Sequence, residues 1–167
     1  METSIPVIGL AGYSNSGKTT FLEKLIAELK RRGYRVGIIK HTHHPVEFDQ
    51  PAKDTWRHAR AGADVVALAA PGGVSLIKKF DHEPVAEKVI SMIDGVDVIV
   101  IEGYKKGKWP KIEIFQQGVT ERPVIPAEEL LAVVSNVPQS AGVPCFGLND
   151  AVGTADLIER VIIKKEI

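Results

Sequence analysis

The residues from Gly12 to Thr19 have the types and the spacing of a phosphate-binding loop. They match the pattern G-x-x-x-x-G-K-[ST] at every fixed position. In such a loop, backbone N–H groups turn inward around phosphate oxygens, and the following helix favours negative charge at its N-terminus. Lys18 is then expected to contact the β- and γ-phosphates, and Thr19 to place its hydroxyl on Mg²⁺. The loop therefore predicts binding of a nucleoside phosphate with magnesium.

The flanking segments have the patterns of a strand and a helix. An apolar run from Ile5 to Ala11 precedes the loop and has the length of a strand. Gly33 follows a basic last turn, as is typical of a helix end. Between loop and Gly33, apolar residues recur at helical spacing: Phe21, Leu22, Leu25, Ile26 and Leu29. Strand, loop and helix thus come in the order that a phosphate site requires.

Length, charge and cysteine content restrict the class of protein. A chain of 167 residues indicates one domain over residues 1–167. Its 21 basic and 21 acidic residues cancel, so no overall charge favours nucleic acid or an anionic membrane. The lone Cys145 suits a reducing compartment. The chain has no signal-peptide pattern and no apolar run of membrane-spanning length, so we expect a cytoplasmic protein.

The rest of the chain predicts an α/β fold. Its patterns predict strands over 34–40, 64–70, 74–79, 97–101, 110–115, 130–134 and 144–148, and helices over 54–61, 85–93 and 155–165. We expect strand 64–70 to be buried, strand 74–79 to pair with it as an antiparallel hairpin edge, and strand 110–115 to have one wet face. In the last helix, Leu157, Ile158, Val161 and Ile162 should face inward. The fold class is a three-layer P-loop NTPase fold: a mostly parallel sheet with helices on both faces, and ligands beyond the carboxyl ends of the strands.

A histidine-rich segment follows the second predicted strand. It contains His41, His43 and His44, with Lys40 before them and Asp49 shortly after. The segment can be a loop that contacts phosphate or a second ligand, a metal site, or a solvated surface loop. Asp49 is a candidate for the magnesium shell or for orienting water, and equally a turn residue.

Three further groups of polar residues are candidates for ligand contacts. Glu102 ends the strand predicted over 97–101, where an acidic residue is expected to hold or polarise the magnesium shell. The loop after it carries Lys105 among three lysines between Tyr104 and Trp109. Such a loop can hold an anionic or ring-bearing ligand by charge and stacking, or be a mobile surface loop. Lys53, Arg57 and Arg60 can share one face of the helix predicted over 54–61.

In combination, these motifs resemble the MobB family, the nucleotide-binding adaptors of molybdopterin-guanine dinucleotide synthesis. The resemblance rests on the phosphate loop, on Lys40-His41-Thr42-His43-His44, on Asp54-Thr55-Trp56-Arg57-His58 with Ala61-Gly62-Ala63, on Glu102-Gly103-Tyr104-Lys105 and on Pro110-Lys111-Ile112. It is close up to about Phe115 and general beyond.

The resemblance implies a dimeric GTP-binding protein with weak Mg²⁺-dependent GTPase activity. It implies that the protein assists the guanylyltransferase MobA, which joins GMP to molybdenum cofactor. Carried over by motif, the nucleotide-binding residues are Gly12, Ser14, Asn15, Ser16, Gly17, Lys18, Thr19 and Thr20. Glu102 would serve the metal shell, and the 41–44 loop with Lys105 would face molybdopterin or the partner.

Guanine specificity is not visible in the residues, because the tetrapeptide Asn-Lys-x-Asp is absent from the chain. The pairs at 135–136 and 149–150, with Asn136 foremost, are the best candidates for contacts to the base.

Two alternatives to the adaptor remain. A small-molecule kinase would need arginines such as Arg57 and Arg60 to close over the transferred group. A metal-inserting GTPase of nickel-chaperone type would use the histidines, although the single cysteine gives it no thiolate pair.

Overall fold

The computed structural model describes residues 5–120 and 123–166. These residues form two compact units: unit 1 runs up to His41 and from Ala86 onward, and unit 2 is Thr42–Val85. The single nucleotide-binding domain over residues 1–167 stays a prediction. In chain order the elements are β1 (Val7–Ala11), α1 (Lys18–Arg31), β2 (Val36–Lys40), α2 (Asp54–Arg60), β3 (Val65–Ala70), β4 (Gly73–Lys78), α3 (Ala86–Ile90), β5 (Val98–Glu102), β6 (Lys111–Phe115), η1 (Ala127–Glu129), β7 (Leu130–Ser135), β8 (Cys145–Gly147), α4 (Ala151–Ile158) and η2 (Glu159–Ile163).

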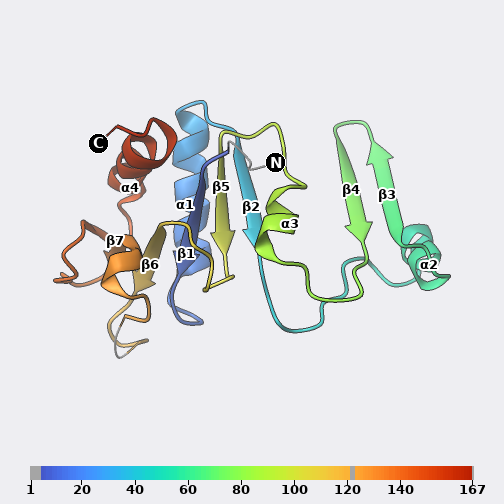
Figure 1. Cartoon of the computed structure of the whole chain (residues 1–167), viewed down its shortest axis with the longest axis horizontal. Coiled ribbons are helices and arrows are strands. Elements are labelled where there is room, and N and C mark those ends of the chain that lie inside the picture. Colours follow the sequence, from blue (N-terminus) through green and yellow to red (C-terminus); the bar gives the residue numbers. More distant parts are fainter. Residues whose placement is uncertain (1–4, 121–122, 167) are drawn as a thin grey trace. The chain divides into compact units, whose positions relative to one another are not determined.

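Unit 1 is built on a six-stranded sheet in the order β2-β5-β1-β6-β7-β8, in which each neighbouring pair is parallel (Figure 1). The register sets Leu10 of β1 and Lys40 of β2 beside Glu102 of β5. Because parallel strands end at one edge of the sheet, the loops after β1, β2 and β5 meet there. The sheet therefore brings together the phosphate loop, His41 and Glu102.

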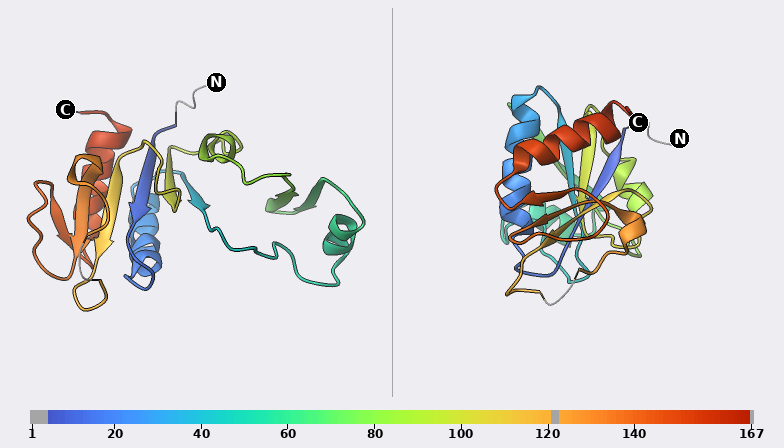
Figure 2. Two further views of the ribbon diagram at one scale, coloured as in Figure 1. Left: turned by 60° about the horizontal axis from the view of Figure 1, so that its bottom comes forward. Right: turned by 90° about the vertical axis from the view of Figure 1, so that its left-hand side faces the viewer.

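Helices cover both faces of this sheet. On one face, Phe21 and Leu25 of α1 and Ile158 of α4 pack in one apolar cluster with strand residues such as Val100. On the other face, Ala86 and Ile90 of α3 pack with strand residues of β2 and β5. Burying each large apolar side chain contributes about 1.5–3 kcal/mol. The predicted α/β class with a largely parallel, three-layer arrangement is confirmed (Figure 2).

The chain passes from β5 to β6 without a helix, although β1 lies between these two strands. The connecting loop runs back across β1, where the indole of Trp109 lies against Gly9. A Cβ atom at position 9 would stand 2.7 Å from Trp109 Nε1, so only glycine lets the loop lie this close. Its first residues consequently stay near the end of β1, beside the phosphate loop.

In unit 2, the predicted hairpin forms: β3 and β4 pair antiparallel from Val65↔Lys78 to Ala70↔Gly73. The hairpin is a separate two-stranded sheet and not an edge of the main sheet. The prediction that 64–70 is a buried strand was wrong, because only Val66 is buried in β3. A strand with one neighbour, covered on one face alone, leaves most of its side chains exposed.

The prediction that strand 110–115 has one solvent-exposed face was also wrong, since all residues of β6 are buried. Lys111, only 2% exposed, donates to the carbonyl of Gly107 and pairs with Glu129. Glu113, 1% exposed, accepts hydrogen bonds from the backbone N–H groups of Val124 (2.6 Å) and Ile125 (3.1 Å). These charged residues are buried because each has its own partners, which the alternating pattern does not reveal.

The last helix begins earlier than predicted, at Ala151, because Asp150 caps it by accepting a hydrogen bond from Gly153 N (2.8 Å). It ends in the π-helical turn η2, which shifts the helical phase. Leu157, Ile158 and Ile162 are buried as expected, whereas Val161 is 37% exposed. In residues 5–120 and 123–166, no helix has the length and apolar character to cross a lipid bilayer.

Candidate functional site

The loop between β1 and α1 is held in conformations that suit a phosphate cradle. Three of its residues have positive φ: Gly12 (+138°), Asn15 (+63°) and Gly17 (+87°). Glycine adopts such angles freely and asparagine tolerates the left-handed region better than most residues do. Gly17 precedes α1 and its carbonyl accepts from Phe21 N at 2.9 Å, which starts the helix. The turn thus directs the first N–H groups of a fourteen-residue helix at the loop.

Gly12 is required for a second reason. A Cβ atom there would lie 2.5 Å from the carbonyl oxygen of Ile114 and 2.9 Å from Ser16 Oγ. The loop is therefore packed directly onto β6. Ser16 is fully buried beneath it, and its hydroxyl has no hydrogen-bond partner among the described residues. Ser14, Asn15, Thr19 and Thr20 are exposed.

Lys18 lies in the first turn of α1 with its ammonium group over the loop. It donates to the carbonyl of Gly12 at 3.1 Å and to that of Tyr13 at 2.5 Å. Partial burial lowers the pKa of Lys18, the nearby Glu102 raises it, and Lys105 and Lys40 lower it further. Three cations near one carboxylate give this end of the sheet positive charge, which favours an anion.

Glu102 and the residue after it complete one wall of the site. The next residue, Gly103, has φ +107°, and a Cβ atom there would lie 2.8 Å from His41 Cβ. Its backbone must therefore pass His41 closely, and His41 N donates to the Glu102 carbonyl at 2.8 Å. The imidazole of His41 stacks on the ring of Tyr104, with centroids 3.8 Å apart, and its Nδ1 accepts from Tyr104 N at 3.4 Å.

Together these segments enclose a cavity of about 280 Å³, whose lining includes Gly12, Ser14, Lys18, His41, Glu102 and Lys105. The sequence predicted each of these six as a site residue, and the structure brings them together. Glu102 lines this cavity, and its carboxylate oxygens suit a hard cation such as Mg²⁺. Thr19, the other predicted magnesium ligand, is exposed in the first turn of α1 and is not among the residues that line the cavity. The cavity thus combines the backbone of the phosphate loop, the Lys18 ammonium group and the Glu102 carboxylate.

Four other predicted residues, His43, His44, Asp49 and Asn136, lie outside the phosphate loop and its helix. His43, His44 and Asp49 belong to unit 2, where His43 Nδ1 lies 3.6 Å from the Glu83 carboxylate and His44 N donates to Thr42 Oγ1 (3.2 Å). Their predicted contacts with a ligand of the phosphate loop stay predictions.

Asn136 is exposed at the end of β7 and is engaged with the backbone of Gln117. Its Oδ1 accepts from Gln117 N at 2.8 Å, and its Nδ2 donates to Gln117 O at 3.3 Å. In this conformation its amide joins the loops after β6 and β7. The predicted contact of Asn136 with a base remains a prediction, and it requires these two bonds to open.

Sequence reasoning missed the support behind the loop. The side chain of Gln116 approaches the loop, since a Cβ atom at Gly17 would lie 3.7 Å from Gln116 Oε1. The stacking of Tyr104 on His41 was not expected either, and the proposed grip of the loop 104–109 on a ligand stays a prediction. Glutamine directly after a buried strand was the only signal for the first contact, and no local pattern marks the second.

Comparison with known proteins places the chain in a family. The family described as "MobB: Molybdopterin guanine dinucleotide synthesis protein B" matches residues 7–136. The molybdopterin-guanine dinucleotide biosynthesis adapter protein of Escherichia coli (strain K12) is 36% identical over 163 residues, which are 94% of this chain and 93% of that protein. The chain belongs to the MobB family.

Other MobB proteins agree over almost the whole chain. The adapter protein of Haemophilus influenzae is 36% identical over 162 residues, covering 96% of this chain and 91% of that protein. The crystal structure of Bacillus subtilis MobB superposes with a TM-score of 0.74 at 28% identity, covering 95% of this chain and 98% of that one. The match extends beyond Phe115, further than the motifs alone indicated.

Proposed function

We propose that the chain binds GTP with Mg²⁺ in the cavity beside β1 and acts as an adaptor in molybdopterin-guanine dinucleotide synthesis. The observation that carries the proposal is the loop Gly12–Thr19, with Lys18 over it and Glu102 on the facing wall. Backbone amides and Lys18 would hold the phosphates. Thr19 and Glu102 would hold Mg²⁺, which supplies charge stabilisation on the γ-phosphoryl group.

The proposed hydrolysis is slow. Within the 280 Å³ cavity, the groups able to accept a proton from water are His41 and Glu102. His41 Nδ1 accepts from a backbone N–H, and Glu102 is assigned to the metal shell. Catalysis then rests on positioning and charge stabilisation without a strong general base, and hydrolysis would serve to reset the loops around the phosphates. The choice of GTP over ATP follows the family.

The adaptor role is supported by family membership and by the two relatives at 36% identity, both of which are named as adapter proteins of molybdopterin-guanine dinucleotide biosynthesis. In this role the chain would assist the guanylyltransferase MobA when GMP is attached to molybdenum cofactor. The loop 41–44 and Lys105 are the residues proposed to face molybdopterin or MobA.

We place the proposed homodimer contact on the hairpin of unit 2. One face of β3 and β4 carries Val65 (48% exposed), Val74 (71%) and Leu76 (53%). An isolated two-stranded sheet is marginally stable in water, and apolar patches on a surface often mark a contact with another chain. A second copy covering this face would bury these side chains.

The test of the nucleotide site compares Lys18→Ala with Lys30→Ala. Each variant removes one ammonium group from α1, but Lys30 is exposed in the last helical turn, away from the loop. We expect phosphate release from GTP with Mg²⁺ to fall about ten-fold or more in Lys18→Ala, because a charge-assisted contact to phosphate is lost. Lys30→Ala should hydrolyse GTP at the rate of the unmodified protein.

Equal rates in the two variants would show that Lys18 does not have the proposed role.

Adding MobA and molybdopterin to the same assay tests the adaptor role separately. Formation of the guanine dinucleotide should rise with the unmodified chain and less with Lys18→Ala. If the unmodified chain hydrolyses GTP but does not affect dinucleotide formation, the proposed nucleotide site stands and the proposed adaptor role is wrong.

A further inference from the structure

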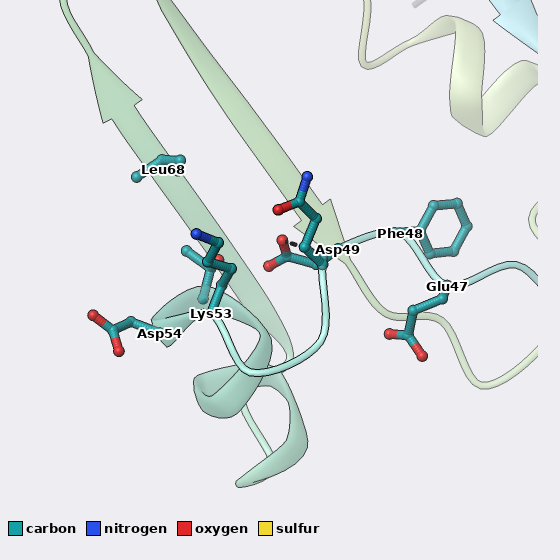
Figure 3. Close-up of a pocket in the computed structure, with 8 residues that line it drawn as sticks. Glu47, Phe48, Asp49, Lys53, Asp54 and Leu68 are labelled. Carbon is teal, nitrogen blue, oxygen red and sulfur yellow. Dashed lines mark hydrogen bonds between the residues drawn. The ribbon is translucent and has the colours of Figure 1, made fainter.

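Unit 2 contains a cavity of its own, formed between the segment 47–50, the start of α2 and β3 (Figure 3). Its volume is about 670 Å³, within the range of small-molecule sites. Phe48, which is 78% exposed, and Leu68, which is 56% exposed, supply apolar surface. A smaller hollow of about 40 Å³ shares both residues, together with Asp49 and Thr55, and extends to Val66 and Ile77. The cavity therefore offers apolar surface to a flat ring.

Asp49 is the acidic residue common to both hollows, and only one of its two carboxylate oxygens accepts a hydrogen bond. Oδ1 accepts a hydrogen bond from Gln50 N at 2.7 Å. Oδ2 is buried, and no described residue donates to it. A buried carboxylate oxygen without a donor is unfavourable, so a ligand N–H that reached it would be bound strongly. Gln50 and Lys53, both exposed and both in the lining, are flexible enough to admit such a ligand.

The neighbouring carboxylates do not turn this place into a cation site. Glu47 accepts a hydrogen bond from Trp56 Nε1 at 3.1 Å, and the side chain of Asp54 is 88% exposed. In Figure 3 the side chains of Glu47, Asp49 and Asp54 are spread apart. Within residues 5–120 and 123–166, Asp49 belongs to no group of three or more side chains able to hold a metal ion. A single carboxylate oxygen beside apolar surface suits an N–H donor better than Mg²⁺, which takes several oxygen ligands.

We propose that this cavity binds the 2-amino-4-oxopyrimidine ring that pterin and guanine share, with Asp49 accepting hydrogen bonds from its N–H edge. That edge presents an amino group and a ring N–H side by side, and a carboxylate is an acceptor for both. Leu68 provides apolar surface for the ring face, whereas the ring of Phe48 lies on the other side of Asp49 and points away from Leu68 (Figure 3). The proposal rests on the proposed function only in the choice of ring. Its site lies in unit 2, and the phosphate loop lies in unit 1.

The experiment uses pairs of phosphate-free ligands that differ at the 2-amino group. Pterin is compared with lumazine, and guanosine with inosine, by fluorescence and calorimetric titration of the full chain. We expect one of the two amino-bearing ligands to bind about ten-fold or more tightly than its partner, since a charge-assisted hydrogen bond is at stake. The pair that shows the preference identifies the ring as pterin or guanine.

Asp49→Asn should abolish this preference. The asparagine can still accept from Gln50 N, but it presents an NH₂ group where Oδ2 stood and so opposes a ligand donor. Asp54→Asn is the matched control, because it neutralises an exposed carboxylate of the same lining and should keep the preference. Thermal melts followed by circular dichroism confirm that both variants fold, and Leu68→Ala should weaken both members of the preferred pair.

Three results would overturn the proposal: no preference in either pair, equal loss in Asp49→Asn and Asp54→Asn, or an unchanged preference in Asp49→Asn with a weakened Mg²⁺ dependence of GTP binding. The last would assign Asp49 to the magnesium shell. The proposed function has a different point of failure, since loss of GTP hydrolysis in Lys18→Ala does not depend on pterin or guanosine binding.

Discussion

At the scale of the residue, the phosphate loop depends on backbone conformations that few side chains permit. Gly12 has φ +138° and its missing Cβ makes room for the Ile114 carbonyl and Ser16 Oγ. Gly33 also has positive φ, at +91°, but no atom lies within 4 Å of the position of its Cβ. A comparison of substitutions at these two positions therefore distinguishes the free-energy cost of a strained backbone conformation from that of a steric clash.

Gly12→Ala should destabilise the protein more than Gly33→Ala and should remove nucleotide binding. An alanine at either position pays about 1–2 kcal/mol for the left-handed region. At position 12 overpacking adds about 1–3 kcal/mol, because backbone of β6 cannot move aside cheaply. Chemical denaturation gives both free energies of unfolding. Equal losses of stability in the two variants would show that β6 does not pack on the loop as described.

The residues of the phosphate loop could be predicted from sequence because glycines, lysine and threonine at fixed spacing serve one backbone geometry. The stacking of His41 on Tyr104 could not, since these residues are brought together by the pairing of β2 with β5 and by no local pattern. Asp49 shows the same limit. A carboxylate that is a turn residue and one that lines a cavity look alike in sequence.

At the scale of the element, α1 and α4 are joined by a network of charged side chains. Arg32 donates to Glu28 at 2.8 Å and to Glu159 at 2.9 Å, and pairs with Asp156 at 2.7 Å. Hydrogen bonds from Arg31 and then Arg32 lower the pKa of Glu28 from 4.5 to about 2. Hydrogen bonds from Lys164, then Arg32 and Tyr34, lower the pKa of Glu159 from 4.5 to about 2.

This network predicts a pH dependence of stability. A carboxyl group whose pKa is lower in the folded state contributes stability above its unfolded pKa, and that contribution is lost as the pH falls through the folded value. The window therefore runs from pH 4.5 down to about 2. Arg32→Met should melt below the unmodified protein at pH 7, and the difference between the two melting temperatures should shrink across this window.

Lys30→Met serves as the control for Arg32→Met, since Lys30 is exposed in the same helix. Its melting temperature should follow that of the unmodified protein at every pH. A constant difference between Arg32→Met and the unmodified protein from pH 7 to pH 2 would mean that Arg32 acts through packing and not through charge.

Most elements could be predicted from periodicity, and the errors have local causes. The strand at 110–115 carries Lys111 and Glu113, whose burial depends on Glu129 and on the backbone of 124–125. Those partners lie far along the chain, so alternation alone suggests a solvated face. The phase error at Val161 follows from the π-helical turn, which has no recognised sequence signal here.

At the scale of the whole molecule, the chain comprises two compact units, and each contributes a different chemistry. Unit 1 carries the phosphate loop on a parallel sheet, and unit 2 carries a cavity and an apolar hairpin face. The hairpin was predicted from the strand patterns over 64–70 and 74–79. The separation of the hairpin from the main sheet was not predicted, because strand patterns do not specify which sheet a strand joins.

The proposed dimer predicts that Leu76→Glu weakens self-association. A carboxylate on the apolar face would be desolvated against the second copy, so the dimer dissociation constant should rise about ten-fold or more. Ser75→Glu is the control, since Ser75 faces the opposite side of the hairpin toward the smaller hollow. Sedimentation velocity over a range of concentrations measures both. Dimers of unchanged stability in Leu76→Glu would place the contact on another surface.

The central claim is that the loop between β1 and α1 binds the phosphates of GTP with magnesium. Isothermal titration calorimetry of the full chain with GTP and Mg²⁺ tests it most directly. The account predicts saturable binding of one nucleotide per chain, weaker without Mg²⁺ and weaker by about ten-fold or more in Lys18→Ala. Absence of heat above dilution in the unmodified protein, or equal affinity in Lys18→Ala, would contradict it.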